Sequence, residues 1–234
     1  MIFHVGIENN NDGRSIAWAL EHPGCFAYGA NADEAVLNLE SAFIKYTGWI
    51  LRHEAQTWLS LPDAKIEFVI NGIWDVYTIN DGLDKTTDAD GYSVESFFPH
   101  DWKPLPALEI KHGLAMLTWS REDLLNSVEG LSPAKSAATY PGERWSINGI
   151  LGHVGGAEWW YLDRLGLAFP REQVPDEPLA RLEIVRKQLV SALCKLEGVQ
   201  KVIGVSGEIW SPRKVLRRAL WHERDHSEHI RKLL

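Results

Sequence analysis

The stretch WHERDHSEHI, residues 221–230, places three histidines close together near the carboxyl end of the chain. On an α-helix each residue advances about 100° around the axis, so His226 lies about 40° to one side of His222 and His229 about 20° to the other. All three side chains therefore share one helix face. Imidazoles four residues apart lie one turn apart, which lets two nitrogens reach a single metal ion without distorting the backbone. The stretch predicts a helix that contributes to a metal site.

The sequence around this stretch is helical from about Leu105 onward, because its apolar residues recur with helical periodicity. Three expected helices each stop at a glycine, which readily ends a helix. They are Pro106–Glu129, Ser146–Leu165 and Glu177–Glu197. A fourth begins at Ser211-Pro212, where serine suits the N-cap and proline the first helical position. Four helices of comparable length are typical of a bundle whose facing helices can build a metal site.

His153, on the second expected helix, is the candidate for a further metal ligand. It shares a helix face with Ala157, Trp160 and Arg164. A histidine alone among glycines and alanines is more often a packed core residue, but a His-x-x-x-His pair on another helix favours a ligand role. Three histidines that leave coordination positions open are the catalytic form of a metal centre, since water or substrate must enter.

Further candidates lie on the same two helices. Arg218, one turn before His222, and Arg164 could each hold a carboxylate of a thiol or substrate. The alternative for each is a solvated arginine or an ion pair with a nearby acidic residue. Asp225 and Glu158 are candidate acceptors for imidazole N–H groups. Trp160 is a further candidate for contact with a substrate.

The segment His222-Glu223-x-x-His226 also matches the zinc-protease motif His-Glu-x-x-His, in which the glutamate is the general base. The few residues after His229 offer no third ligand of the kind found downstream in such proteases. The motif is also short enough to occur by chance. We therefore discount a protease.

The carboxyl-terminal pattern resembles the DinB/YfiT family of metal-binding four-helix bundles, over roughly Pro106 to the end. The matching segments are Arg144-Trp145-Ser146, Leu151-Gly152-His153, Ala157–Asp163, Trp210–Arg213, Leu216 and Ala219–Ile230. The resemblance implies that His153, His222 and His226 bind divalent nickel or zinc. His229 falls where relatives often have glutamine, which implies a flanking polar residue. Characterised relatives are mostly thiol-dependent transferases or isomerases and often homodimers, so a low-molecular-weight thiol is an implied cofactor.

The amino-terminal part is expected to be a small domain of strands and one helix. Ile2–Ile7 and Arg14–Leu20 are expected strands, joined by a polar turn at Glu8–Gly13. A short strand, Cys25–Tyr28, follows. Asn31 then opens an amphipathic helix with acidic residues in its first turn, and Lys65–Ile70 is a further strand.

The segments His22–Gly29 and Ala32–Leu39 are similar to the HicB family, whose members carry a Pro-Gly-Cys turn, a glycine and a helix that opens with an acidic-Glu-Ala pattern. The likeness covers about the first 75 residues. It implies a small α/β domain of partial ribonuclease H or dsRNA-binding-domain-like topology, used mostly to hold a protein partner.

Turn-forming residues separate the two parts of the chain. We therefore expect an α+β protein of two domains: a HicB-like α/β domain at 1–80, a connector at 81–105, and a DinB-like all-α four-helix bundle at 106–234. Within the connector, Ser93–Phe98 could add one edge strand.

Composition restricts the remaining options. The net charge of −8 argues against nucleic acid as a partner, because phosphate binding needs a basic surface. The amino terminus leaves no room for a signal sequence, and no apolar run is long enough to span a membrane, so we expect a soluble cytoplasmic protein. Two cysteines are too few for a thiolate metal cage, which leaves nitrogen or oxygen ligands.

These observations favour a divalent-metal-dependent enzyme of the DinB/YfiT type, a thiol-dependent transferase or hydrolase that uses a metal-activated thiol or water. The alternative is a non-enzymatic interaction or stress-response module, in which the HicB-like domain binds a protein partner and the metal is structural. Metal-dependent turnover of a thiol with an electrophilic substrate would distinguish the two.

Overall fold

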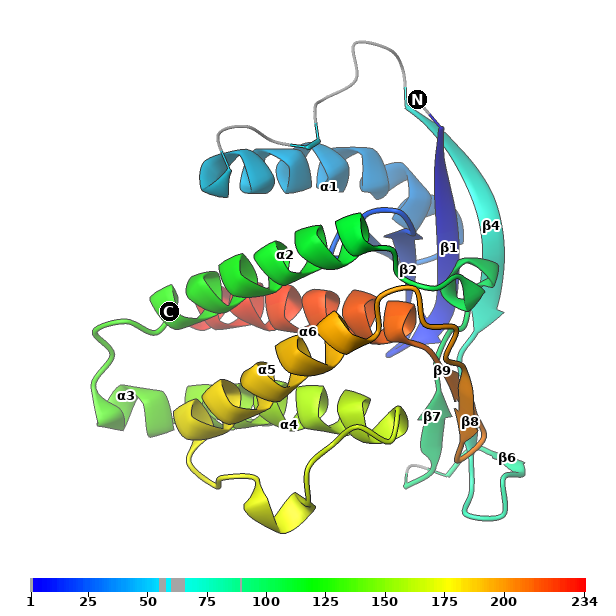
Figure 1. The fold of residues 1–234 in the computed structure, drawn as a ribbon. Coiled ribbons are helices and arrows are strands. Elements are labelled where there is room, and N and C mark those ends of the chain that lie inside the picture. The colour runs from blue at the N-terminus through cyan, green and yellow to red at the C-terminus, as the bar shows by residue number, and fades with distance from the viewer. Residues whose placement is uncertain (1, 55–57, 60–65, 89) are drawn as a thin grey trace. The chain divides into compact units, whose positions relative to one another are not determined.

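The computed structural model describes residues 2–54, 58–59, 66–88 and 90–234 as a mixed α and β protein (Figure 1). The chain divides into two compact units. The first takes in the residues up to Lys103 together with Val202–Lys214, and the second consists of Pro104–Lys201 and Val215–Leu234. The segment 81–105, which we expected to be a connector, therefore lies almost entirely within the first unit.

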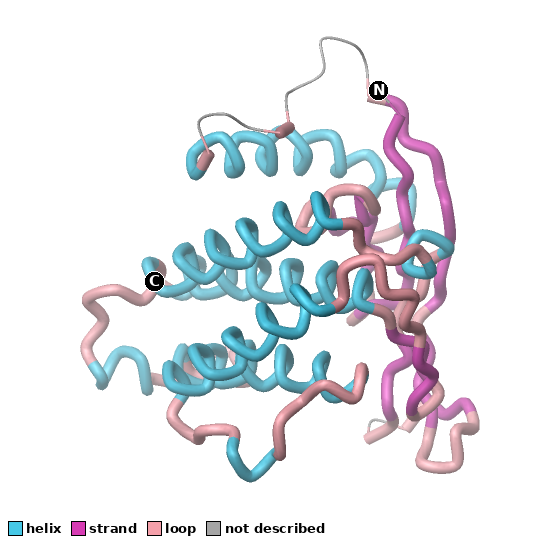
Figure 2. The backbone as a smooth tube through the Cα atoms, in the orientation of Figure 1, coloured by secondary structure: helices cyan, strands magenta, loops and turns pink. Residues whose placement is uncertain are grey.

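The first unit contains a four-stranded sheet with the strand order β3-β2-β1-β4. In chain order, this part of the unit consists of β1 (Ile2–Asn11), β2 (Arg14–Ala19), β3 (Phe26–Gly29), the helix α1 (Ala32–His53) and β4 (Glu67–Asp75). β1 is antiparallel to β2 and parallel to β4, which runs beside it (Figure 2). The side-chain oxygen of Asn31 accepts from the backbone N–H of Glu34, so Asn31 caps α1 as expected. Lys65, where we expected the last strand to begin, lies outside the described residues.

The turn between β1 and β2 is shorter than predicted. We expected Glu8–Gly13 to form it, but β1 continues to Asn11. The Glu8 carboxylate is fully buried and accepts hydrogen bonds from the Ser96 backbone N–H (3.0 Å) and the Asn11 side chain (2.6 Å). These donors compensate for its burial, so a polar sequence can continue the strand. Only Asp12 and Gly13, both with positive φ, make the turn.

Two smaller sheets complete the first unit. The three-stranded sheet, with the order β6-β5-β7, contains β5 (Tyr77–Ile79), β6 (Lys85–Thr86) and β7 (Tyr92–Val94), and the 3-10 helix η1 (Pro99–Trp102) follows it. The edge strand expected within Ser93–Phe98 is therefore β7, slightly earlier in the chain. The hairpin of β8 (Ile203–Val205) and β9 (Glu208–Trp210) is an element that was not predicted from the sequence.

The second unit is helical and contains the helices that the sequence predicted. Its elements are α2 (Ala107–Asn126), α3 (Pro133–Ala137), α4 (Ile147–Arg164), the 3-10 helix η2 (Arg171–Gln173), α5 (Pro178–Lys195) and most of α6 (Pro212–Leu233). Gly130, Gly166 and Gly198 follow α2, α4 and α5 with positive φ, as helix-ending glycines do. The short helices α3 and η2 were not predicted.

A buried apolar cluster holds α4 in place within this unit. Its members come from α2, α4, α5 and α6 and are Leu124, Ile147, Ile150, Leu151, Val154, Leu182 and Ile230. Four of the seven lie on α4 at helical spacing, so the inward face of that helix is fixed by the burial of apolar surface. His153 directly precedes the buried Val154.

Candidate metal centre

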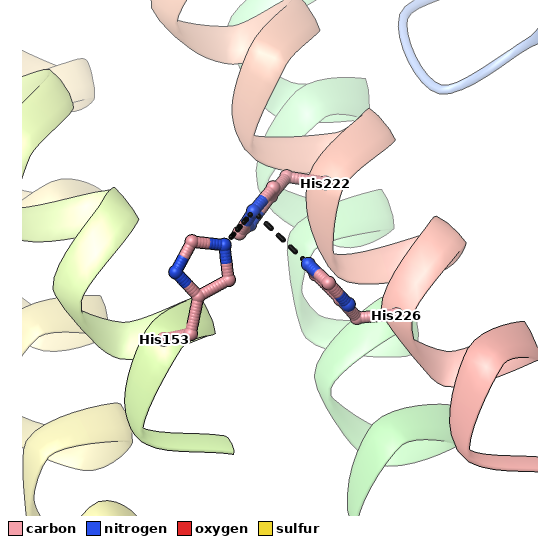
Figure 3. A group of neighbouring side chains, drawn as sticks. All are labelled: His153, His222 and His226. Atoms are coloured by element: carbon pink, nitrogen blue, oxygen red, sulfur yellow. Dashed lines mark hydrogen bonds between the residues drawn. The ribbon is translucent and has the colours of Figure 1, made fainter. Parts of the chain in front are cut away.

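Three histidine side chains converge in the second unit (Figure 3). His153 comes from α4, and His222 and His226 come from α6. The Nε2 atom of His222 lies 2.9 Å from Nε2 of His153 and 3.2 Å from Nε2 of His226. Across the described residues, these three form the one group of His, Cys, Asp or Glu side chains whose ligand atoms are spaced for a shared metal ion. The convergence expected from the sequence is therefore present.

Local structure explains why the rings meet. Residues four apart on α6 project to the same side, which brings the ring centroids of His222 and His226 to 4.5 Å. On α4 the hydroxyl of Ser146 accepts from the backbone N–H of Gly149 at 3.2 Å and caps the helix. The buried cluster then sets the rotation of α4, which brings the ring centroid of His153 to 4.7 Å from that of His222.

The close nitrogens fit a bound cation better than hydrogen bonds among themselves. An imidazole nitrogen carries either one hydrogen or one in-plane lone pair, so Nε2 of His222 cannot accept well-directed hydrogen bonds from both neighbours at once. A cation between the rings would be bound by all three lone pairs. Two nitrogens that each lie about 2.1 Å from one ion are at most about 4.2 Å apart. The separations of 2.9 and 3.2 Å satisfy that limit.

The three imidazoles are neutral at pH 7. Burial lowers the pKa of His153, and the nearby Arg144 lowers it further. Burial, the neighbouring imidazoles and Arg218 hold the pKa of His222 well below its usual range. Burial and the adjacent His153 and His229 lower the pKa of His226 to about 3. Histidine binds metals in its neutral form, so these environments prepare all three residues as ligands.

Glu158 does not accept a hydrogen bond from a ligand histidine, which corrects our expectation. It lies in a buried group of ion pairs instead, with Arg186 Nε at 3.0 Å and Arg121 Nη2 at 3.2 Å. Asp225 does not take that role for the α6 histidines either, because the buried Nδ1 atoms of His222 and His226 have no hydrogen-bond partner among the described residues. The charge of the two arginines explains why Glu158 turns toward them.

Glu223 belongs to the same buried group. Its carboxylate pairs with Arg121 Nε at 2.5 Å and Arg186 Nη2 at 2.7 Å, and it also accepts from the Ser120 hydroxyl. Burial alone would raise the pKa of Glu223, but the attraction of the two arginines and the hydrogen bonds outweigh it and lower the pKa. A fully buried carboxylate held in this way cannot act as the base of a zinc protease. The discounted protease reading is therefore excluded by geometry.

His229 lies outside the group formed by the three other histidines. Its Nε2 atom lies 2.8 Å from Glu143 Oε2, and both side chains are 29% exposed. Its ring remains beside that of His226, with a centroid distance of 5.8 Å. His229 thus pairs with Glu143 beside the group, and its role as a flanking polar residue stays a prediction.

The arginines singled out from the sequence have other contacts. Arg164 donates to Asp163 at 2.6 Å, which is the ion pair weighed as its alternative. Its guanidinium also lies 5.1 Å from the centroid of the Trp160 ring. Arg218 is buried with its guanidinium 4.2 Å from the Trp221 ring centroid, and its charge still reaches His222.

Trp145 and Arg144 lie near the site, although the sequence had suggested no role for them. The Trp145 ring stacks on His153 with a centroid distance of 4.4 Å and an interplanar angle of 27°. The Arg144 guanidinium lies 4.7 Å from the Trp145 ring centroid. Their position directly before the N-cap Ser146 was the available signal, because that end of α4 is the one nearer His153.

Comparison with known proteins bears on the second unit. A search of curated proteins finds no match to the chain. Within the described residues, no helix is both long enough and apolar enough for a membrane span. Residues 116–230, which include all three converging histidines, match the family model of the DinB superfamily, so this part of the chain is a DinB superfamily domain.

Proposed function

We propose that His153, His222 and His226 together bind one divalent metal ion, nickel or zinc, in a four-helix bundle of the DinB/YfiT type. The observation that carries the proposal is the convergence of three neutral imidazoles from two helices. The buried ion pairs support the bundle, because Arg121, Glu158, Arg186 and Glu223 come from α2, α4, α5 and α6 in turn. Members of the DinB superfamily often bind metals.

The reaction that this site supports best is a thiol-dependent transfer or a hydrolysis. A divalent ion held by the three histidines would lower the pKa of a thiol or water that binds it, and so would supply a nucleophile at neutral pH. The ligand group contains no cysteine. A thiol nucleophile would therefore come from a low-molecular-weight thiol. The chain would provide the three ligands and hold them in a fixed orientation, and the Trp145 ring stacks on His153.

For the amino-terminal part we propose a HicB-like domain that binds a protein partner. The chain order of three strands, a helix and a fourth strand parallel to β1 supports the likeness. A homodimer is a further proposal, made on the resemblance of the second unit to DinB/YfiT proteins.

Metal analysis of the purified protein tests the site. We expect about one nickel or zinc ion per chain after loading and dialysis, and a loss of that ion in His153→Ala and in His226→Ala. His229→Ala is the matched control, because His229 bonds to Glu143 and leaves the ligand group intact. Metal content in the two ligand variants equal to that of the parent protein would contradict the proposal.

Activity is tested separately, with the metal-loaded protein, a low-molecular-weight thiol and an electrophilic substrate. The enzyme proposal predicts turnover that disappears in His153→Ala and remains in His229→Ala. Full metal content without turnover, combined with a protein that co-purifies with the first unit, would favour the non-enzymatic interaction module.

A further inference from the structure

The charges around the three histidines are unbalanced. All three ligand candidates are imidazoles, which bind metals in their neutral form, and in the described part of the chain no carboxylate belongs to their group. The acidic side chains nearby are paired with other residues. Glu143 bonds to His229, while Glu158 and Glu223 are held by Arg121 and Arg186. A divalent ion bound here would therefore keep its full positive charge.

Two guanidinium groups add to this positive charge. Arg144 belongs to the same aromatic stack as His153, and Arg218 lies one helical turn before His222 on α6. Arg218 is only 3% exposed and is packed against Trp221. Arg144 is exposed, and the described residues include no acidic partner for it. It is thus the guanidinium that a solute can reach.

Trp145 determines where Arg144 lies. The indole ring stacks on His153, and the guanidinium lies against the same indole ring. Arg144 and Trp145 are neighbours in the sequence, and the next residue, Ser146, is the N-cap of α4. The Arg144 guanidinium is thereby connected to the ligand histidine through the indole ring of Trp145.

We propose that Arg144 is a specificity-determining residue that binds a carboxylate of the substrate or of the thiol, next to the metal centre. A planar guanidinium matches a carboxylate with two parallel hydrogen bonds, and the uncompensated positive charge favours an anion over a neutral molecule of similar shape. The substrate class is therefore a small molecule that carries a carboxylate beside its metal-binding group. This inference rests on the proposed metal site.

The test compares 3-mercaptopropionate with 3-mercapto-1-propanol, two thiols that differ in a carboxylate and a hydroxymethyl group. Their dissociation constants are measured on protein loaded with cobalt(II), from the absorption that appears when a thiolate binds the metal. We expect the preference for the carboxylate thiol to fall by about tenfold or more in Arg144→Gln, since hydrogen bonds between charged partners are among the strongest. The cobalt content and the spectrum without thiol should stay unchanged.

Arg171→Gln is the matched control. The Arg171 guanidinium lies 5.0 Å from the Trp159 ring centroid, so it has the same kind of aromatic contact without a neighbouring ligand histidine. This variant should keep the parent preference. An equal preference in the parent protein and in Arg144→Gln would overturn the carboxylate site alone. Failure of the parent protein to bind cobalt would overturn the metal site as well, so the two failures can be told apart.

Discussion

Arg121 and Arg186 neutralise two carboxylates on the helices that carry the ligand histidines. Glu223 directly follows His222, and Glu158 follows His153 by five residues. All four charged groups are buried or nearly so. Because the carboxylates are engaged by the arginines, they do not compete for the ion or compensate its charge. The ion pairs thereby contribute to the positive character of the site.

Removing one of these charges should destabilise the protein strongly. Glu223→Gln leaves two buried guanidiniums with one carboxylate, and breaking a buried pair in this way costs about 3–5 kcal/mol. Chemical unfolding of parent and variant measures the difference. Glu228→Gln is the control, because Glu228 and Arg231 form an exposed pair, and a change within about 0.5 kcal/mol is expected there. Equal stability of both variants would contradict the ion-pair account.

His22 gives the first unit a predictable pH dependence. Its ring lies among Phe3, Phe43 and Tyr46, and burial, opposed by Glu21, lowers its pKa from 6.5 to about 4. Protonation therefore favours the unfolded chain. The stability that depends on neutral His22 is fully present above pH 6.5 and is lost as the pH falls toward 4.

The variant His22→Phe should consequently lose less stability between pH 7 and pH 4.5. We expect its loss to be about 2 kcal/mol smaller than that of the parent protein, measured by urea unfolding at both pH values. Identical losses in the two proteins would show that His22 titrates normally in the folded state.

The approach of α4 to α5 depends on a glycine two residues after His153. A Cβ atom at Gly155 would lie 2.9 Å from Arg181 Cγ and 3.3 Å from the backbone nitrogen of Leu182. At Gly156 the nearest atom would be Arg181 Nη1 at 3.9 Å, an ordinary contact. Adjacent positions on one helix therefore differ in whether they tolerate a side chain.

This difference predicts opposite results for two alanine substitutions. Gly156→Ala should stabilise the protein by up to about 1 kcal/mol, because alanine favours a helix over glycine. Gly155→Ala gains the same propensity but forces α4 away from α5, and overpacking costs about 1–3 kcal/mol. We expect a lower melting temperature and weaker metal binding for Gly155→Ala. Equal melting temperatures for the two variants would rule out close helix packing at Gly155.

The sequence predicted elements well where local signals mark their ends. The glycines after α2, α4 and α5 and the Ser211-Pro212 start of α6 are such signals. The β8–β9 hairpin was missed, although Ser206-Gly207 between two short strands was a usable turn signal. The extension of β1 to Asn11 was not predictable locally, because one of the two residues that compensate Glu8 is Ser96, 88 residues away.

In the candidate site too, contacts between residues far apart in the sequence could not be predicted. The face shared by His222 and His226 follows from helix geometry, and the approach of His153 follows once the helices are packed together. Arg121 and Arg186 could not be assigned from sequence, since Arg121 meets Glu223 across 102 positions. For the same reason the sequence led us to expect that Glu158 accepts a hydrogen bond from an imidazole, whereas it pairs with Arg121 and Arg186.

For the molecule as a whole, metal binding should add to the stability of the second unit. A ligand that binds only the folded state adds about 2.7 kcal/mol to the free energy of unfolding when its free concentration is 100 times its dissociation constant. Removal of the ion with a chelator should therefore lower the melting temperature of the parent protein and leave that of His226→Ala nearly unchanged. A chelator effect of the same size in both proteins would place the ion elsewhere.

X-ray absorption spectroscopy of the nickel- or zinc-loaded protein tests the central claim most directly, because it counts the imidazoles around the ion. The proposed site predicts three imidazole nitrogens at about 2.1 Å in the parent protein and two or fewer in His226→Ala. A spectrum without imidazole scattering, or one that His226→Ala leaves unchanged, would contradict a metal centre built from His153, His222 and His226.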